Sequence, residues 1–110
     1  MKTPTRLPEV VTRYLAAVNR WDGALAAGCF APNATVHDEH HDYSGREAIR
    51  AWVVETSLKY RPTFTPLRSF AGDRRVRLSV AVSGQFPGSP VTLDYELRIR
   101  GGKISTLTIE

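Results

Sequence analysis

Residues 34–49 have the sequence Ala34-Thr-Val-His-Asp-Glu-His-His-Asp-Tyr-Ser-Gly-Arg-Glu-Ala-Ile49. This stretch contains all three histidines of the chain, together with four carboxylates and a tyrosine. Its first part, Ala34 to Asp38, alternates apolar and polar residues, which predicts a short strand. Side chains alternate across a strand, so Val36 and Asp38 share one face while Thr35 and His37 share the other. A carboxylate is therefore expected on the same face as a core valine.

The residues after this strand predict a loop and then the start of a helix. The loop is expected over Glu39–Tyr43. The sequence Ser44-Gly-Arg-Glu47 fits the Ser-x-x-Glu capping box, in which each side chain satisfies a free backbone N–H. We expect the helix to run from Gly45 to about Tyr60, because Arg61-Pro62 ends it. Its apolar stripe consists of Ile49, Trp52, Val53 and Thr56.

Two further helices are expected before this stretch. Helical spacing of apolar residues predicts the first, from about Pro8 to Arg20. Its apolar positions are Val11, Tyr14, Leu15 and Val18. Asp22 can cap a shorter helix from Gly23 to about Phe30, which Pro32-Asn33 breaks. The apolar side of this second helix is expected to consist of Leu25, Ala26 and Cys29.

From Thr63 onward the apolar residues recur at every second position, which predicts strands. Gly-Asp, Pro-Gly-Ser-Pro and Gly-Gly turns separate four runs, so we expect consecutive antiparallel strands. The runs cover about Thr63–Phe70, Val76–Phe86, Val91–Arg100 and Lys103–Glu110. Helices followed by a meander of strands predict an α+β fold with the helices on the apolar face of the sheet.

Length and composition indicate one ordinary globular domain over residues 1–110. The chain is 42% hydrophobic and 24% charged, which excludes the disordered and fibrous classes. No apolar run approaches the ~18 residues of a membrane span, so no membrane partner is expected. The N-terminus, Met1 to Pro8, lacks the apolar centre of a signal peptide. We therefore expect a cytoplasmic protein.

The positive charge does not predict nucleic-acid binding. The formal net charge is +4, but the arginines are scattered and are not interleaved with stacking aromatic residues. The one cluster, Arg74-Arg75-Val76-Arg77, follows a Gly-Asp turn and is expected to be a solvated strand entry. The single Cys29 lies in an apolar run, which favours an inert buried thiol over a nucleophile.

Several pieces of sequence, in this order, resemble the SnoaL-like domains of the NTF2-like superfamily, which also includes ketosteroid isomerase. The pieces are Arg13-Tyr-Leu-Ala-Ala-Val-Asn19, Asp22, Phe30-Ala-Pro-Asn-Ala-Thr-Val-His-Asp38, Ser44-Gly-Arg-Glu-Ala-Ile49 and Gly102-Lys-Ile104. The resemblance implies a cone in which three N-terminal helices pack on a curved, mainly antiparallel sheet. It also implies a hydrophobic pocket between the helices and the sheet.

The resemblance to ketosteroid isomerase implies roles for two residues. Asp38 matches the general base of that enzyme, and Tyr14 matches the tyrosine that stabilises the enolate oxygen. A simple alignment places Asp94 on the third catalytic position, the protonated acid. The alternation of residues instead places Asp94 on the polar face, so we expect Tyr95 in the pocket. The expected pocket-lining residues are Val36, Trp52, Val53, Phe64, Phe86, Tyr95, Leu97 and Leu107, and Phe70 is a further aromatic candidate.

The histidine-rich run also permits a metal site, because imidazole and carboxylate are common metal ligands. Neighbouring residues of a strand point in opposite directions, however, so His37 and Asp38 do not face one ion unless the loop folds back. His40, His41 and Asp42 on the loop are the alternative set that could converge on a metal. We therefore expect no metal, and a polar rim at the mouth of the pocket formed by His40, His41 and Tyr43. One of these histidines can also carry a proton near neutral pH.

Two functions remain open from the sequence. The first is an isomerase or cyclase without a cofactor, in which Asp38 moves a proton next to the carbonyl of a small apolar compound. The second is a non-catalytic module of the same fold that binds a small ligand or dimerises, with a structural Asp38. In either case we expect a homodimer through the outer sheet face, over Arg77, Ser79, Ala81, Ser83, Glu96 and Arg98.

Overall fold

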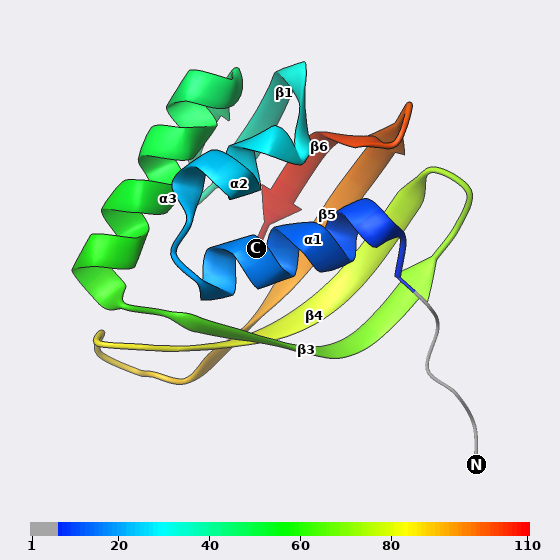
Figure 1. The fold of residues 1–110 in the computed structure, drawn as a ribbon. Helices are drawn as coiled ribbons and strands as arrows, with labels where there is room; N and C mark the ends of the chain where they lie inside the picture. Colours follow the sequence, from blue (N-terminus) through cyan, green and yellow to red (C-terminus); the bar gives the residue numbers. More distant parts are fainter. Residues whose placement is uncertain (1–6) are drawn as a thin grey trace.

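The computed structural model describes residues 7–110 and shows an α+β fold (Figure 1). The first six residues, part of the segment searched for a signal peptide, lie outside the described residues. Helices cover one face of a curved sheet. The helices are α1 (Glu9–Asn19), α2 (Gly23–Gly28) and α3 (Arg46–Tyr60). The strands are β1 (Phe30–Asp38), β2 (His41–Ser44), β3 (Thr63–Ala71), β4 (Arg75–Ser83), β5 (Val91–Arg100) and β6 (Lys103–Ile109).

The six strands form one sheet in the order β2-β1-β6-β5-β4-β3. Strands β3 to β6 form the expected antiparallel meander. Strand β1 pairs in parallel with β6, and β2 pairs antiparallel with β1 at the edge. The sheet is thus mostly antiparallel, as the sequence predicts. Because β1 lies beside β6, the end of the histidine-rich strand meets the C-terminal strand.

The apolar stripe of α1 is buried as predicted. Val11, Tyr14, Leu15 and Val18 all lie in the core, where α1 faces the sheet. Asp22 caps α2 as predicted, since its carboxylate accepts a hydrogen bond of 3.0 Å from the backbone N–H of Leu25. The prediction that Leu25 faces the core is wrong, because its side chain is 53% exposed. The short α2 instead packs on α3 through Gly23, where a Cβ would lie 2.6 Å from Val54.

Helix α3 does not start with the predicted capping box. Its N-cap is Gly45, with a φ of 86°, and no side chain caps the helix. Ser44 is still part of β2, where its hydroxyl lies 3.4 Å from that of Thr35. Because Ser44 pairs with Thr35 in the sheet, its side chain does not cap the helix.

Three strand predictions also need correction. Strand β1 begins at Phe30 rather than Ala34, with a bulge between Phe30 and Thr35 that accommodates the prolyl segment. Strand β4 ends at Ser83 rather than Phe86, because the chain turns at Gly84, where a Cβ would lie 2.5 Å from the carbonyl oxygen of Tyr60. The expected loop Glu39–Tyr43 is mostly a hairpin, since β2 begins at His41.

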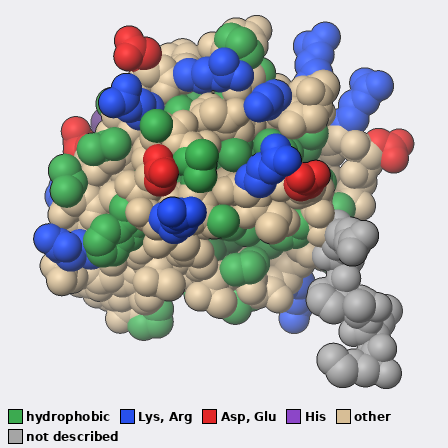
Figure 2. Space-filling model, in the orientation of Figure 1, with side chains coloured by type: hydrophobic (Ala, Val, Ile, Leu, Met, Phe, Trp, Pro, Cys, Tyr) green, Lys and Arg blue, Asp and Glu red, His purple; other side chains and the backbone are tan. Residues whose placement is uncertain are grey.

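Charged side chains are mixed with other groups on the face that carries the helices. Figure 2 shows Lys and Arg side chains spread over this face and interspersed with acidic and hydrophobic groups. No helix within residues 7–110 has the length and apolar character needed to cross a membrane.

Candidate functional site

Asp38 lies at the end of β1, where the histidine-rich stretch turns back into β2. Its carboxyl group is half-buried, and its Oδ2 accepts a hydrogen bond of 3.2 Å from Nε1 of Trp52 on α3. Trp52 is in turn stacked on Tyr43 of β2, with ring centroids 5.7 Å apart. The helix and the edge hairpin thus hold the carboxylate in place together.

The surroundings of Asp38 raise the pKa of its carboxyl group above the ordinary value of 3.8. Partial burial is the largest cause, and the nearby charge of Glu39 adds to it. The hydrogen bond from Trp52 and the charge of His41 act in the opposite direction. His41 is the residue directly opposite Asp38 in the β1–β2 pair. A carboxylate with a raised pKa is a stronger base than an exposed one.

A pocket of about 500 Å³ opens beside Asp38 at the end of strands β1 and β6. Leu93 and Ile109 give it apolar walls. Charged and polar side chains form the rest of its lining: His37, Asp38, Glu39, His40, Thr108 and Glu110. The pocket therefore places one half-buried carboxylate beside a small apolar surface in a mainly polar lining.

Asp38 and Tyr95 lie in one cross-strand row on the face of the sheet that carries the core. Asp38 pairs with Ile109, and Ile109 pairs with Tyr95. Tyr95 is only 3% exposed, while Asp94 is exposed on the polar face, so Tyr95 faces the core. Neither Tyr95 nor Tyr14 is among the residues that line the pocket beside Asp38.

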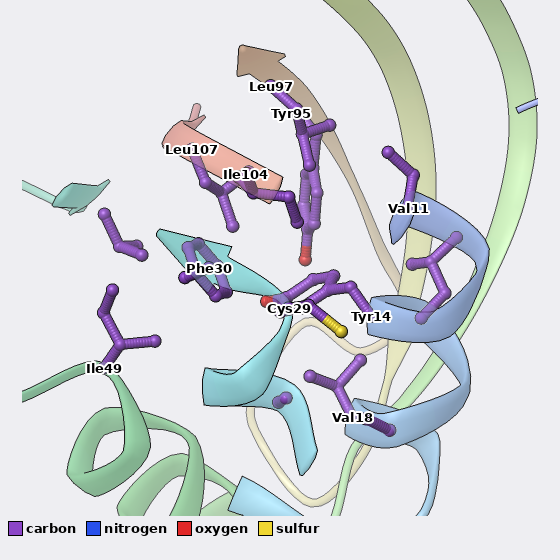
Figure 3. Packing of buried hydrophobic residues seen from close by; sticks show 14 of the residues in the cluster. Val11, Tyr14, Val18, Cys29, Phe30, Ile49, Tyr95, Leu97, Ile104 and Leu107 are labelled. Atoms are coloured by element: carbon purple, nitrogen blue, oxygen red, sulfur yellow. The ribbon is translucent and has the colours of Figure 1, made fainter. Parts of the chain in front are cut away.

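Tyr14 and Tyr95 bring two phenol groups into the same part of the interior. Figure 3 shows the hydroxyl of Tyr95 pointing toward Tyr14 in the space between α1 and the sheet. Burial raises the pKa of both phenols, and the charge of Asp38 raises it further. Both groups therefore stay protonated near neutral pH and can donate a hydrogen bond.

The turn between β1 and β2 has an unusual backbone. Glu39 and His40 both have positive φ angles, 49° and 68°. A two-residue turn of this kind favours Asn-Gly, since other residues lose energy in the left-handed region. Such backbone strain is common at functional sites. Here it places His40 in the pocket and His41 beside Asp38.

The structure places the expected site residues in three regions: at the pocket, in the core and on the surface. Asp38 and His40 line the pocket, and Tyr43 and His41 lie close to Asp38 on the same side. Val36, Val53, Leu97, Leu107, Trp52 and Tyr95 are buried in the core, and Phe64 and Phe86 are half-buried against it. Phe70 is 70% exposed, so it lines no interior space.

Sequence reasoning missed three kinds of contribution to the site. It predicts a loop where strand β2 forms, although His41 and Tyr43 alternate with Asp42 and Ser44 as in a strand. The walls from Leu93, Thr108 and Ile109 depend on the pairing of β1 with β6, which the sequence pattern does not contain. The hydrogen bond between Trp52 and Asp38 joins positions 14 residues apart and has no local signal.

The remaining reactive groups do not form a second centre of this kind. Within residues 7–110, no three His, Cys, Asp or Glu side chains are placed to hold a metal ion together. Cys29 is buried, and that burial raises the pKa of its thiol. A thiol with a raised pKa is a poor nucleophile.

Comparison with known proteins assigns the family. The family model of the SnoaL-like domain matches residues 11–107, nearly the whole chain. The chain belongs to the SnoaL-like domain family. A comparison with curated proteins finds no match.

Solved structures similar to this SnoaL-like domain include proteins linked to cyclisation. A candidate polyketide cyclase from Sinorhizobium meliloti, protein SMa1630, is 36% identical over 94% of this chain and 95% of that chain, with a TM-score of 0.91. A protein with a ketosteroid isomerase-like fold from Catenulispora acidiphila, solved with trimethylamine, is 23% identical over 96% and 86%, with a TM-score of 0.85. The epoxide hydrolase/cyclase-like enzyme SalBIII of salinomycin pyran ring formation is 22% identical over 92% and 86%, with a TM-score of 0.79. The last two similarities show the fold alone.

Proposed function

We propose that this SnoaL-like domain is an enzyme of the isomerase or cyclase type that acts without a cofactor on a small apolar carbonyl compound. Asp38 is the general base that removes a proton from the carbon next to the carbonyl. One observation carries the proposal: the half-buried carboxylate of Asp38 lines the pocket and is held there by the hydrogen bond from Trp52. The name of the relative from Sinorhizobium meliloti supports a cyclase type.

The surroundings of Asp38 fit a base in two respects. Its raised pKa increases the basicity of the carboxylate. The hydrogen bond from Trp52 occupies Oδ2 and leaves Oδ1 for the substrate proton. A fixed base near its target contributes typically ~10²–10⁴-fold to a rate.

The phenols are the proposed partners of the developing negative charge. When the proton leaves, charge moves to the carbonyl oxygen, and a neutral phenol O–H stabilises it by donating a hydrogen bond. Tyr14 holds this role in the proposal because it matches the isomerase position. Tyr95 supports Tyr14 in this role, since its hydroxyl points toward Tyr14.

A second candidate function is supported by Asp94 and by the packing of the core. Asp94 faces the polar side, so the interior lacks the protonated acid of ketosteroid isomerase. Tyr14, Trp52 and Tyr95 are also tightly buried. A module that binds a small apolar ligand at the pocket without chemistry uses the same residues, with Asp38 as a polar anchor.

Deuterium exchange distinguishes the two candidates. Wild type and Asp38→Asn are incubated in heavy water with a panel of apolar ketones that includes a steroid enone precursor, and exchange is followed by mass spectrometry. We expect the variant to lose about tenfold or more, equivalent to ~1.4 kcal/mol of barrier. Asp42→Asn is the matched control, because Asp42 lies on the neighbouring strand but on the opposite face. A wild type that exchanges none of the ketones favours the binding module.

A further inference from the structure

The outer face of the sheet carries a second polar site, away from the helices. The strand register places Thr35, Thr106, Arg98 and Arg75 in one cross-strand row. The adjacent row contains His37, Thr108, Glu96 and Arg77. Between these rows lies a pocket of about 370 Å³, lined by Glu96, Arg98, Thr106 and Thr108.

The charges around this pocket are not balanced. Arg75 and Arg98 lie directly opposite each other in the β4–β5 pair. Like charges in this position destabilise a sheet. Glu96 compensates Arg75, with 3.3 Å between Nε and Oε2. Within residues 7–110, no carboxylate forms an ion pair with Arg98. The guanidinium of Arg98 therefore remains available beside the pocket.

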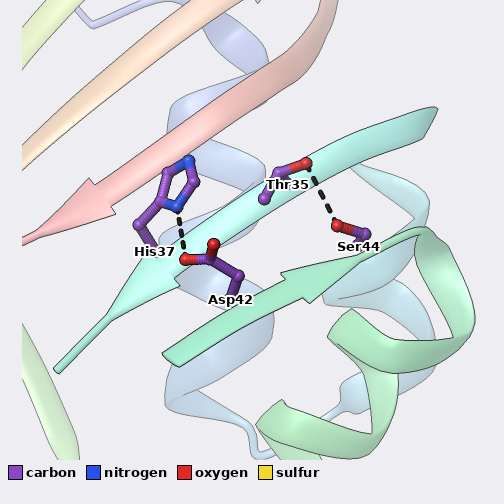
Figure 4. Close-up of polar contacts among 4 residues, drawn as sticks. All are labelled: Thr35, His37, Asp42 and Ser44. Atoms are coloured by element: carbon purple, nitrogen blue, oxygen red, sulfur yellow. Dashed lines mark hydrogen bonds and ion pairs between the residues drawn. The ribbon is translucent and has the colours of Figure 1, made fainter. Parts of the chain in front are cut away.

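Besides Arg98, the lining consists of two hydroxyl groups and the carboxylate of Glu96, which is paired with Arg75. Thr106 and Thr108 contribute hydroxyl groups to the lining, one on each side of Leu107 along β6. His37 is the register partner of Thr108. Its Nδ1 donates a hydrogen bond of 2.6 Å to Asp42, and Figure 4 shows its other ring nitrogen pointing toward β6. Asp42 is thus already engaged on the far side of the imidazole.

We infer that this outer pocket is a binding site for a small oxyanion, a carboxylate or phosphate group of a ligand. The planar guanidinium of Arg98 matches two oxygens of such a group. Thr106 and Thr108 donate to the remaining oxygens. The inference is independent of the chemistry proposed for Asp38. Because Thr108 lines both pockets, a longer ligand held at Arg98 extends toward Asp38 around the end of β6.

Calorimetric titration of the full chain with inorganic phosphate at low ionic strength tests the site. We expect saturable one-to-one binding by the wild type and a loss of about tenfold or more in Arg98→Gln. Arg98→Lys keeps the positive charge but loses the planar pair of N–H donors of the guanidinium, so it is expected to bind phosphate with intermediate affinity. Arg68→Gln is the matched control, because it removes the same charge from β3 on the same face. Succinate in place of phosphate distinguishes a carboxylate site from a phosphate site.

Two further comparisons make the test decisive. Asp38→Asn is expected to bind phosphate as the wild type does, so failure of the proposed base does not affect this result. Equal weakening by Arg98→Gln and Arg68→Gln, or absence of saturable binding by the wild type, would overturn the inference. A dimer in light scattering that binds no phosphate until it dissociates would also overturn it and would assign the pocket to a second copy of the chain.

Discussion

The indole N–H of Trp52 donates a hydrogen bond of 3.2 Å to the carboxylate of Asp38, joining the middle of α3 to the end of β1. This bond favours the charged form of the carboxylate, so it opposes the effect of burial on the pKa. The Trp52→Phe variant keeps an aromatic ring beside Tyr43 but removes the N–H group that donates to Asp38. We expect the pKa of Asp38 to rise further and the free energy of unfolding to fall by about 1–2 kcal/mol.

Carboxyl NMR titration and chemical denaturation measure these two effects. Trp21→Phe is the control, because the indole N–H of Trp21 donates to the carbonyl of Pro62 at 2.8 Å, in another part of the molecule. That variant is expected to lose stability without any change in the Asp38 titration. An Asp38 pKa that stays the same in Trp52→Phe would show that the hydrogen bond is not formed in solution.

The raised pKa of Asp38 predicts a pH-dependent effect of Asp38→Asn on stability. As the pH rises from the ordinary value of 3.8, Asp38 ionises first in the unfolded chain. The folded state then holds more protons, so the free energy of unfolding of the wild type falls until the folded-state pKa is passed. The amide that replaces the carboxyl group in Asp38→Asn does not titrate. The stability of the variant relative to wild type should therefore increase with pH across this window and then level off. Urea denaturation at a series of pH values measures the difference, and a decrease would contradict the burial of Asp38.

The turn at Glu39 and His40 predicts an increase in stability on substitution. Both residues have positive φ, so the double variant Glu39→Asn with His40→Gly places suitable residues in a turn that already exists. We expect a gain of about 1 kcal/mol in the free energy of unfolding. Gly102→Ala is a control in the opposite direction, because it places a side chain at a residue with a φ of 76°. No atom lies within 4 Å of the added Cβ, so any loss of stability in this variant comes from the backbone conformation. Loss of stability in the double variant would indicate that the two side chains hold the turn in place.

The outer sheet face predicts a homodimer. Arg77, Ser79, Ala81 and Ser83 of β4 form a mixed and partly small surface, with Glu96 and Arg98 of β5 at one end of it. A dimer centred on Ala81, which pairs with Thr92, leaves the pocket beside Arg98 open. Light scattering at micromolar concentration is expected to give twice the chain mass of 12.2 kDa. Ala81→Arg, at the centre of this surface, should raise the dissociation constant by about tenfold or more, equivalent to ~1.4 kcal/mol. A monomer mass for the wild type would exclude the dimer.

Local patterns predicted the parts of the fold that depend on local physics. The helical spacing around Tyr14 and the alternation around Tyr95 identified buried faces correctly, because burial follows the period of each element. The capping box at Ser44 failed since a sheet neighbour, Thr35, competes for the same residue. A prediction from nearby residues cannot include such a distant partner.

The site likewise contains one part that local patterns predict and one part that depends on long-range strand pairing. Alternation along β1 placed Asp38 on the face of Val36, as the structure shows. The pocket itself forms where β1 meets β6 in parallel, so Leu93, Thr108 and Ile109 reach Asp38 only through the strand order. A distant segment near the C-terminus contributes these walls, and no motif in residues 34–49 specifies that pairing.

The pH dependence of deuterium exchange tests the role of Asp38 most directly. With any ketone that the wild type exchanges, the value of kcat/KM is measured from about pH 3 to about pH 8 for wild type, Asp38→Asn and Asp42→Asn. A base must be deprotonated, so we expect the wild-type rate to rise through one ionisation above 3.8, the ordinary value for an aspartate. Asp42→Asn should follow the same curve, whereas Asp38→Asn should be slower by about tenfold or more and lack this step. The same curve for Asp38→Asn as for the wild type would contradict the proposal that Asp38 is the base.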